Sequence, residues 1–370
     1  MPHAPHAQLD VAVVGAGRMG RHHARTYANL EGARLVGVVD LDLGRARAVA
    51  EQYDSAAFAS VDDLLASCGG LAAATVAAPT AEHVAAAEPL LRRGVACLVE
   101  KPLAPTSAEA GALRDLARQR GVVLGVGHSE RFNPAVRAVL SMGVTPRFLE
   151  IDRVSPMTFR SMDVGVVMDM MIHDLDIVLA LVGSPIARTD AVGVAVLSSH
   201  EDMASARLTF TNGCVANLTA SRMALNTERK LRLFSEEAYV SLDYQARTGL
   251  IVRREEHDAS IAGVRSRLAE GADLSGLDYA SMVNVEELKM DRESNGRPLE
   301  RDPLTAELTD FLRAVREGGE PVVTADAGAA AVAAAEGVVR AIADHRWDGL
   351  ELPSRSHAAA AWTGDRAGAS

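Results

Sequence analysis

The chain is predicted to be an α/β protein with two domains, a parallel α/β domain followed by an α+β domain. From Leu9 to about His128, short β-branched runs alternate with amphipathic segments, as they do when helices cover both faces of a parallel sheet. After residues 131–134 the strands become longer and tight turns join them, which favours an antiparallel sheet. A length of 370 residues allows two or three domains. We place the first domain at residues 1–128, the second at 129–345 and a flexible tail at 346–370.

The first domain is expected to alternate strands and helices from its beginning. Its strands are identified by short apolar runs and its helices by apolar residues that recur every three or four positions. The predicted strands are Leu9–Val14, Arg34–Asp40, Ala73–Ala77, Val95–Val99 and Val122–Val126. The predicted helices are Arg18–Asn29, Leu43–Gln52, Ala81–Arg93 and Ser107–Arg120.

The second domain is expected to contain a β-hairpin at Asn212-Gly213, a pair that favours a type I′ turn. Strands Met203–Thr211 and Val215–Ser221 flank this pair. Further strands are predicted at Arg147–Arg153, Arg229–Phe234, Tyr239–Tyr244 and Leu250–Arg254. Helices are predicted beside the sheet at Val166–Leu181 and, packing back on the core, at Thr305–Glu317 and Ala325–Asp344.

The overall composition limits the classes of partner. A net charge of −11 argues against nucleic acid or an anionic membrane as the main partner, since both attract basic surfaces. The three cysteines show no metal-ligand or redox spacing, which is typical of reduced thiols in a cytoplasmic protein. Residues 1–10 lack the apolar core of a signal peptide, and Glu336 and Arg340 interrupt the alanine-rich stretch near residue 329. We therefore expect a cytoplasmic protein without a membrane segment.

The segment Gly15-Ala16-Gly17-Arg18-Met19-Gly20 has the glycine pattern of a dinucleotide-binding loop. It follows a predicted strand and opens a predicted helix, the context in which this pattern is informative. Its glycines can turn the chain tightly, admit a pyrophosphate to the backbone and let the helix approach the strand. We expect Gly15, Gly17, Arg18, Met19 and Gly20 to bind a dinucleotide.

Asp40 supplies the second part of this prediction. It ends the next predicted strand, where a carboxylate accepts hydrogen bonds from the ribose hydroxyls of the dinucleotide. Its negative charge would repel a 2′-phosphate, which favours NAD over NADP. Arg45 lies nearby, where its charge could instead attract that phosphate.

Lys101, in Glu100-Lys101-Pro102 after a predicted strand, is the first candidate for chemistry. It is one of three lysines in a chain whose other cationic side chains are arginines. An ammonium desolvated near a positive charge can lose its proton, which a guanidinium does not do in practice. Alone, Lys101 would be interpreted as a solvated loop residue. Its position in a dinucleotide-binding domain favours an active-site role.

Asp169 and His173 lie one helical turn apart, and Asp176 continues the same face while Asp174 points elsewhere. Imidazole and carboxylates that converge in this way can transfer protons. A packing histidine is the alternative, supported by the apolar residues around His173. A metal site is a second alternative, but the sequence offers no further ligands at a suitable spacing, so we expect no metal.

These motifs together resemble the Gfo/Idh/MocA oxidoreductases in order and spacing. The segments that carry the resemblance are Gly15–Gly20, Pro79–His83, Glu100–Pro102 and Asp169–Asp174. The resemblance implies a Rossmann domain, a second domain with a large open-faced, mostly antiparallel sheet that often builds homodimers or homotetramers, and a nicotinamide cofactor between them. It implies sugars, polyols or nucleotide sugars as substrates. The resemblance also implies that five further residues lie on the cofactor side of the site: Pro79, Thr80, His83, Glu100 and Lys101.

Residues 127–134 and 162–169 are further similar to the UDP-N-acetylglucosamine 3-dehydrogenases, some of which supply 3-amino sugar nucleotides for lipid A or O-antigen. This similarity implies a cationic pocket for the diphosphate, formed by Arg131, Arg153 and Arg160, since guanidinium geometry matches phosphate. Asn133 belongs to the same segment and is expected to contact the substrate. Ordinary surface charge is the alternative for Arg153 and Arg160.

The sequence therefore predicts NAD-dependent oxidation of the C3 hydroxyl of a UDP-linked amino sugar. His173, oriented by Asp169, is the expected base, and Lys101 would stabilise the developing alkoxide, although the two roles can be exchanged. One alternative is a dehydrogenase for inositol or a free sugar, which needs no diphosphate pocket. Another is a non-catalytic NAD sensor, against which the presence of all three side chains argues.

Overall fold

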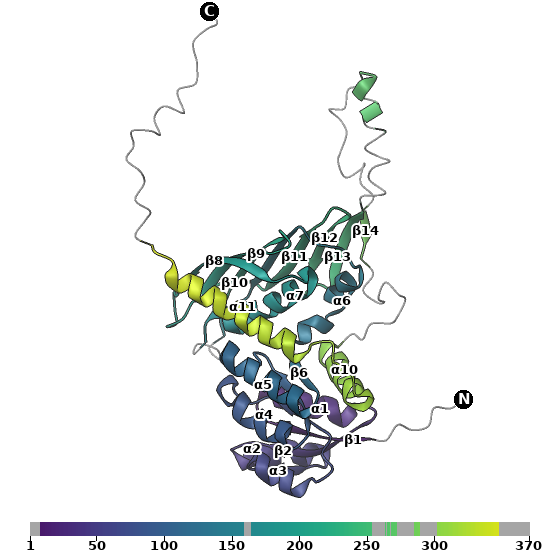
Figure 1. Ribbon diagram of the computed structural model, residues 1–370, viewed down its shortest axis with the longest axis vertical. Coiled ribbons are helices and arrows are strands. Elements are labelled where there is room, and N and C mark those ends of the chain that lie inside the picture. Colours follow the sequence, from purple (N-terminus) through teal and green to yellow (C-terminus); the bar gives the residue numbers. More distant parts are fainter. Residues whose placement is uncertain are drawn as a thin grey trace, which may run out of the picture.

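The computed structural model describes residues 8–158, 164–253, 263, 265–266, 268–271, 285–288 and 302–347. These residues form two sheets, one in each half of the elongated molecule, with the first domain at the bottom of Figure 1 and the second above it. Arg160 and the predicted tail beyond residue 347 lie outside the described residues. The predicted division of the chain after residue 128 stays a prediction.

The first sheet is parallel, with the strand order β3-β2-β1-β4-β5-β6. The order reverses between β1 and β4, and the crevice at the carboxyl ends of these two strands is where open α/β sheets bind their ligands. The strands are β1 (Leu9–Val14), β2 (Ala33–Val39), β3 (Ala56–Phe58), β4 (Ala73–Val76), β5 (Ala96–Glu100) and β6 (Leu124–Gly127).

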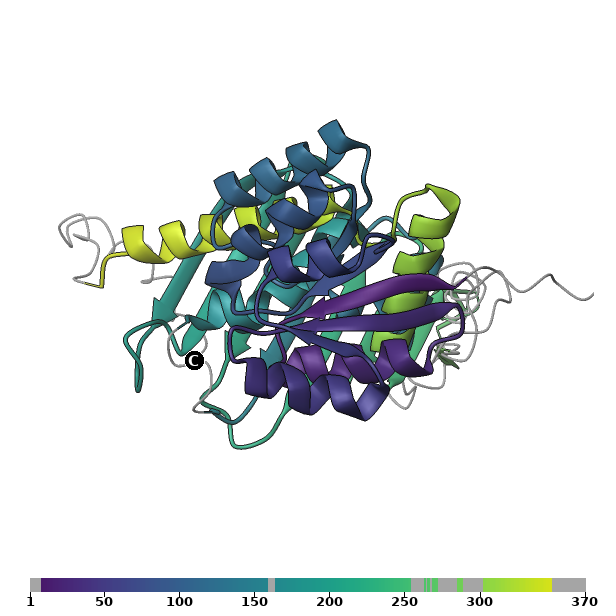
Figure 2. The same ribbon diagram turned by 90° about the horizontal axis from the view of Figure 1, so that it is seen from below.

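Helices cover both faces of this sheet, as Figure 2 shows from below. They are α1 (Arg18–Asn29), α2 (Leu43–Ala50), α3 (Val61–Ser67), α4 (His83–Arg92) and α5 (Ser107–Arg120). Local chemistry sets several of their ends: Thr106 caps α5 by accepting the backbone N–H of Glu109, and Gly121 ends it with a φ of 63°. The sequence did not indicate β3 and α3, which are short.

The second sheet has the strand order β14-β13-β12-β11-β7-β10-β9-β8. Only the β7–β10 pair is parallel among the described pairs, so this sheet is mostly antiparallel, as expected. The strands are β7 (Phe148–Val154), β8 (Ile186–Val194), β9 (Met203–Phe210), β10 (Val215–Ser221), β11 (Glu228–Phe234), β12 (Ala238–Asp243), β13 (Thr248–Arg253) and β14 (Val285–Glu287). In β7 and β10 every second residue is buried, so one face of the sheet packs on the core.

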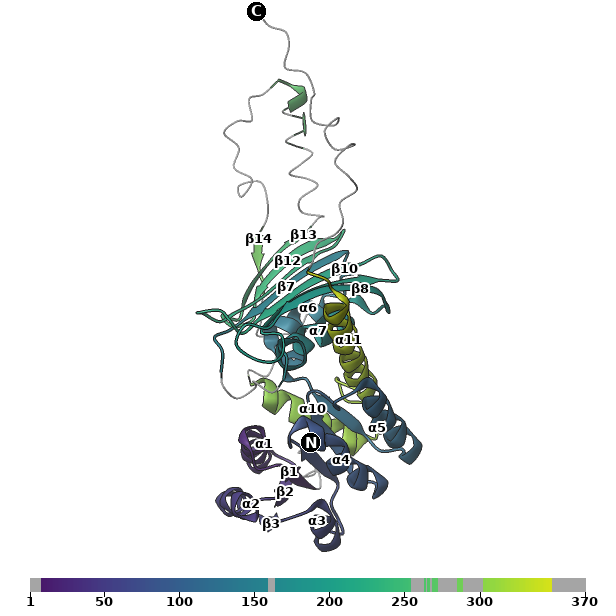
Figure 3. The ribbon, with the colours of Figure 1, turned by 90° about the vertical axis from the view of Figure 1, so that its left-hand side faces the viewer.

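The face toward the first domain carries helices α6 (Pro134–Ser141), α7 (Ile172–Val182) and α11 (Ala325–Asp344), as Figure 3 shows. Helix α11 contacts α5 and β6 as well as α7 and β8, and so ties the two sheets together. Its Gly328 lies so close to β6 that a Cβ there would be 2.4 Å from a methyl carbon of Val126. Helix α10 (Pro303–Glu317) packs on α1 and on η3 (Ser129–Phe132). No described helix is both long enough and apolar enough to cross a membrane.

The predicted hairpin and the predicted helix beside the sheet are both present, but the predicted turn type is wrong. Among described non-glycine residues only Asp54 and Arg247 have a positive φ, so Asn212 cannot form a type I′ turn. Instead the backbone N–H of Gly213 donates to the carbonyl oxygen of Phe210 and closes a longer loop. Gly213, with a φ of 83°, is the left-handed residue of this loop. The predicted helix Val166–Leu181 begins with a π-helical turn, η4 (Val167–Met171), before α7. Residue propensities do not distinguish such a turn from an α-helix.

Candidate active site

A cavity of about 690 Å³ lies at the carboxyl ends of β1, β2 and β4. A Cβ at Gly15 would lie 2.6 Å from the carbonyl oxygen of Ala77, and one at Gly20 would lie 1.7 Å from that of Gly15, so both positions require glycine. A Cβ at Gly17 would meet no atom within 4 Å, which leaves open space beside the backbone where α1 begins. This opening suits a pyrophosphate at a helix N-terminus. The predicted cofactor residues that line the cavity are Gly15, Gly17, Met19, Asp40, Arg45 and Pro79.

Asp40 is buried at the edge of this cavity, at the end of β2. One carboxylate oxygen accepts the backbone N–H of Ala16 at 2.8 Å, and the other accepts the N–H of Asp42 at 2.9 Å and Arg45 Nη2 at 3.0 Å. The oxygen bonded to Ala16 keeps capacity for a ribose hydroxyl. Arg45 is occupied by Asp40, which opposes its use for a 2′-phosphate.

The remaining predicted cofactor residues do not line this cavity. Arg18 is exposed and is not part of the lining, and Thr80 begins the short η2 helix (Thr80–Glu82). His83 is buried, and its two ring nitrogens lie 2.9 Å from the carbonyl oxygens of Ala78 and Pro102. It therefore links the loop after β4 to the segment that contains Lys101.

Glu100 is buried beneath that segment. Its Oε1 lies 2.7 Å from His23 Nε2, and its Oε2 accepts the backbone N–H of Lys101 at 3.2 Å. Burial alone would raise the pKa of this carboxyl, but His23 and Lys101 together hold it below its usual value. Glu100 is therefore a carboxylate, and it positions the backbone of Lys101.

A second cavity, of about 180 Å³, lies where the end of β5 meets η4 and α7. Lys101, Asp169 and His173 all line it, so the structure brings together the three predicted catalytic residues. Lys101 Nζ donates to the carbonyl oxygen of Asp169 at 2.6 Å and lies 3.4 Å from its carboxylate oxygen Oδ1. Asp169 belongs to the π-helical turn, a feature often found at functional sites. We call this space the catalytic cavity.

His173, in the first turn of α7, is half-buried and electrically neutral in this environment. Burial, and after it the positive charge of Lys101, lowers the pKa of His173 well below its usual value. Its Nδ1 is buried without a hydrogen-bond partner among the described residues. No hydrogen bond joins it to Asp169 in the described part of the chain, so the expected orientation of His173 by Asp169 is not observed. Asp169 holds Lys101 instead.

The expected convergence of Asp176 on this site is wrong. Asp176 is buried one turn further along α7, where its Oδ2 lies 3.7 Å from Arg131 Nε, and it does not line the catalytic cavity. Helix α7 runs into the interior at this point, so the same helix face meets η3 rather than the cavity. Arg131 is likewise buried, with Nη1 directed at the carbonyl oxygen of Asp176, and is not part of the cavity lining.

Arg153 lines the catalytic cavity, but its guanidinium is already bound. Its Nε and Nη2 donate to the two carboxylate oxygens of Asp174 at 2.7 and 2.8 Å, and its Nη1 donates to Glu130 at 3.3 Å. The pair is buried, with side-chain exposures of 4% for Arg153 and 2% for Asp174. Asn133 lies outside this cavity, caps α6 through Ala135 N and donates to Glu130. Arg160 lies outside the described residues.

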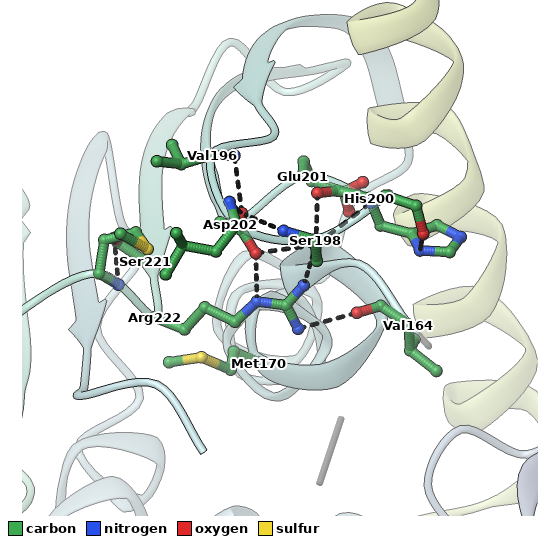
Figure 4. A network of polar contacts seen from close by, with 12 residues as sticks. Val164, Met170, Val196, Ser198, His200, Glu201, Asp202, Ser221 and Arg222 are labelled. Carbon is green, nitrogen blue, oxygen red and sulfur yellow. Dashed lines mark hydrogen bonds and ion pairs between the residues drawn. The ribbon is translucent and has the colours of Figure 1, made fainter. Parts of the chain in front are cut away.

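The sequence did not single out two further arginines of the cavity wall, Arg222 and Arg229. Arg222 is buried and donates to Asp202 Oδ1, to Ser198 Oγ and to the carbonyl oxygen of Val164, as Figure 4 shows. Arg229 is more exposed and lies directly opposite Arg153 in the β11–β7 register. Strand pairing is the signal that could have found Arg229, because Arg153 was already a candidate.

A dinucleotide cleft in a parallel domain, joined to a second sheet domain with a lysine, an aspartate and a histidine at the junction, defines a two-domain nicotinamide-dependent oxidoreductase. Residues 9–128 match the family model described as "Oxidoreductase family, NAD-binding Rossmann fold", and residues 144–241 match the GFO/IDH/MocA C-terminal domain. The chain belongs to the Gfo/Idh/MocA family, and NAD is its cofactor. The expectations for family, fold class and cofactor are thereby confirmed.

Among its relatives, the UDP-N-acetylglucosamine 3-dehydrogenase of Acidithiobacillus ferrooxidans is 37% identical over 308 residues, which are 83% of this chain and 88% of that protein. A solved structure of that enzyme, GnnA, matches with a TM-score of 0.77 and 35% identity over 90% of this chain and 98% of the other. A levoglucosan dehydrogenase in complex with NADH and L-sorbose matches with a TM-score of 0.76 over 91% of this chain and 97% of the other. At 18% identity, that second likeness concerns the fold alone.

In the described part of the chain, no cluster of three or more His, Cys, Asp or Glu side chains could hold a metal ion.

Proposed function

We propose that this protein oxidises the C3 hydroxyl of UDP-N-acetylglucosamine to the 3-keto sugar nucleotide. The observation that carries the proposal is the catalytic cavity, in which the Lys101 ammonium and the neutral His173 face the same small space beside the cofactor domain. The substrate comes from the similarity to the A. ferrooxidans enzyme. When bound, NAD⁺ supplies the acceptor for the hydride that leaves C3.

The environments of the two side chains support different roles. Lys101 Nζ donates to a carbonyl and lies beside a carboxylate, contacts that suit a protonated amine. His173 is neutral and can accept a proton. Groups whose surroundings favour opposite protonation states define an acid–base assignment. We therefore assign removal of the O3 proton to His173 and stabilisation of the alkoxide to Lys101, which Asp169 positions.

The proposed product is a ketone suited to transamination, so the protein would feed synthesis of a 3-amino sugar nucleotide for lipid A or another lipopolysaccharide sugar. We also propose a cytoplasmic homodimer or homotetramer. This proposal of assembly rests on the family resemblance, in which the open face of the second sheet often builds oligomers.

A dehydrogenase for inositol or a free sugar is the second candidate. The size of the catalytic cavity favours it, since about 180 Å³ accommodates a single ring without a nucleotide. Incubation of the enzyme and NAD⁺ with UDP sugars, free sugars and inositols, with mass detection of each ketone, separates the two. Oxidation of an inositol as efficiently as any UDP sugar would favour the second candidate.

The catalytic assignment predicts the behaviour of two variants. Lys101→Met and His173→Ala should each lower kcat by about 10²–10⁴, the usual range for positioned proton transfer, and leave NAD⁺ binding nearly unchanged. Lys230→Met is the matched control, because Lys230 lies on β11 in a half-exposed ion pair with Glu228 and outside the cavity lining. Near-normal NADH formation by both active-site variants at saturating substrate would contradict the assignment.

A further inference from the structure

A third cavity, of about 480 Å³, adjoins the catalytic cavity at Arg229, which lines both. Ligand sites in proteins commonly span about 300–1,000 Å³. The catalytic cavity, at about 180 Å³, is below that range and suits one sugar ring. The third cavity lies within the range. An extended ligand with its sugar in the catalytic cavity would therefore pass Arg229 and continue into the larger space.

Arg229 has donor groups available for such a ligand, whereas Arg153 does not. The two residues are paired across β11 and β7 and share the carboxylate of Glu130. Arg153 is 4% exposed and chelated by Asp174, but the side chain of Arg229 is 43% exposed and forms one hydrogen bond among the described residues, from Nη1 to Glu130 at 2.8 Å. Its Nε and Nη2 groups can bind an anion.

The third cavity is lined by two guanidinium groups, those of Arg229 and Arg247, and by one carboxylate, that of Glu130, which Arg229 shares with Arg153. Arg222, in the wall of the catalytic cavity, is neutralised by buried Asp202. Arg247, in the turn after β12, lines the third cavity with Arg229 and forms no ion pair within the described part of the chain. An acidic protein of net charge −11 thus presents two guanidinium groups where a diphosphate would lie.

The third cavity also contains a buried polar group that lacks a partner. Tyr244 lines the cavity and is 3% exposed, and its hydroxyl has no hydrogen-bond partner among the described residues. Buried polar atoms are normally paired, so this hydroxyl keeps hydrogen-bonding capacity for a molecule bound in the cavity. Ser129, Thr227 and Gln245 add donors and acceptors to the same lining, which suits a ribose and a base.

We infer that Arg229 binds the diphosphate of the nucleotide sugar and that the third cavity holds its nucleoside. This inference rests on the proposed function for the identity of the sugar and deepens it by assigning the nucleotide site. The diphosphate is thus assigned to Arg229 and Arg247. The sequence had assigned it to Arg131 and Arg153, which are buried in other contacts.

The test measures UDP binding to the full-length enzyme with NAD⁺ by calorimetry, together with the kinetics of UDP-N-acetylglucosamine. Arg229→Ala should raise the Kd for UDP and the KM for the sugar nucleotide about tenfold or more, the effect of losing a charge-assisted hydrogen bond. Because this contact is the same in ground and transition states, kcat should stay within about threefold. Arg229→Lys should restore part of the affinity, and Arg247→Ala, on an exposed turn, should weaken UDP without affecting folding.

Arg147→Ala is the matched control. Arg147 precedes β7 at the opposite end from Arg153, and it forms a comparable exposed ion pair, with Glu236 at 2.8 Å. Arg147→Ala should leave the Kd for UDP and the KM for the sugar nucleotide unchanged. Melting curves of all variants show whether each remains folded.

Each outcome decides between the inference and the proposed function. If UDP binds and Arg229→Ala weakens it, the nucleotide site stands, even if UDP-N-acetylglucosamine is not oxidised and the proposed sugar is therefore wrong. If the sugar nucleotide is oxidised with an unchanged KM in both the Arg229 and Arg247 variants, the proposed function stands and the inference is overturned. Failure of UDP to bind, or equally strong competition by inorganic phosphate, also overturns it.

Discussion

Replacement of Asp40 by serine tests how this chain selects its cofactor. The carboxylate lines the dinucleotide cavity at the end of β2 and is positioned by Ala16 N, Asp42 N and Arg45. Asp40→Ser removes a charged acceptor for the ribose hydroxyls, a loss of about 1.5–3 kcal/mol. Since 1.4 kcal/mol corresponds to a factor of ten, the Kd for NAD⁺ should rise roughly 10- to 150-fold.

The same substitution should relax the discrimination against NADP⁺. Two unit charges 4 Å apart repel each other by about 1 kcal/mol in water and by about 4 kcal/mol at the effective dielectric constant of a protein surface. Removal of the Asp40 charge eliminates that repulsion and frees Arg45 to meet the 2′-phosphate. The ratio of kcat/KM for NADP⁺ to that for NAD⁺ should therefore increase by roughly 5- to 900-fold.

The assay measures kcat/KM with both cofactors and any sugar that the wild type oxidises, with Asp42→Ser as the control. Asp42 caps α2 through the N–H groups of Gly44 and Arg45 and also lies 3.4 Å from Arg45 Nε, but it is not part of the cavity lining. Serine caps a helix about as well as aspartate does, so Asp42→Ser should change stability little and leave cofactor preference unchanged. The role assigned to Asp40 would be refuted if Asp40→Ser kept the wild-type ratio of kcat/KM for NADP⁺ to that for NAD⁺. It would also be refuted if this ratio changed equally in Asp40→Ser and Asp42→Ser.

Two further predictions concern buried and catalytic carboxyl groups. Burial, and after it the charges of Glu100, Asp176 and Asp310, raises the pKa of Glu307 well above its usual value, and neither carboxyl oxygen has a partner among the described residues. Because the pKa of Glu307 is higher in the folded state than in the unfolded state, its contribution to the free energy of unfolding is fully present below about pH 4.5. This contribution is lost as the pH rises through the folded pKa. Glu307→Gln should therefore raise Tm more at pH 8 than at pH 5. Equal changes in Tm at the two pH values would contradict this. Asp169→Asn should lower kcat by less than Lys101→Met does, because Lys101 Nζ keeps its 2.6 Å bond to the backbone carbonyl; an equal loss of turnover would show that the Asp169 charge itself acts in catalysis.

The sequence predicted most accurately the elements whose ends are set by local chemistry. Helices α1, α5 and α11 have the predicted bounds. A glycine loop begins the first, and threonine caps begin the other two, so the signals that start them are read from adjacent residues. Strand β3 has three residues, too few for a period to appear, and it exists because β2 offers it an edge. Elements of that kind depend on tertiary pairing and are not apparent from local pattern.

The same limit applies to the cationic residues of the candidate site. Sequence alone identified arginines near the substrate, but whether a guanidinium is free depends on which carboxylates the fold places beside it. Arg153 and Arg229 occupy paired positions on neighbouring strands and share Glu130. What separates them is Asp174, which reaches Arg153 from the first turn of α7 and leaves Arg229 with a single partner among the described residues. A buried arginine in a bidentate pair maintains the cavity wall, because removing its partner would leave an uncompensated charge, whereas a half-exposed arginine with open donors can select an anionic substrate.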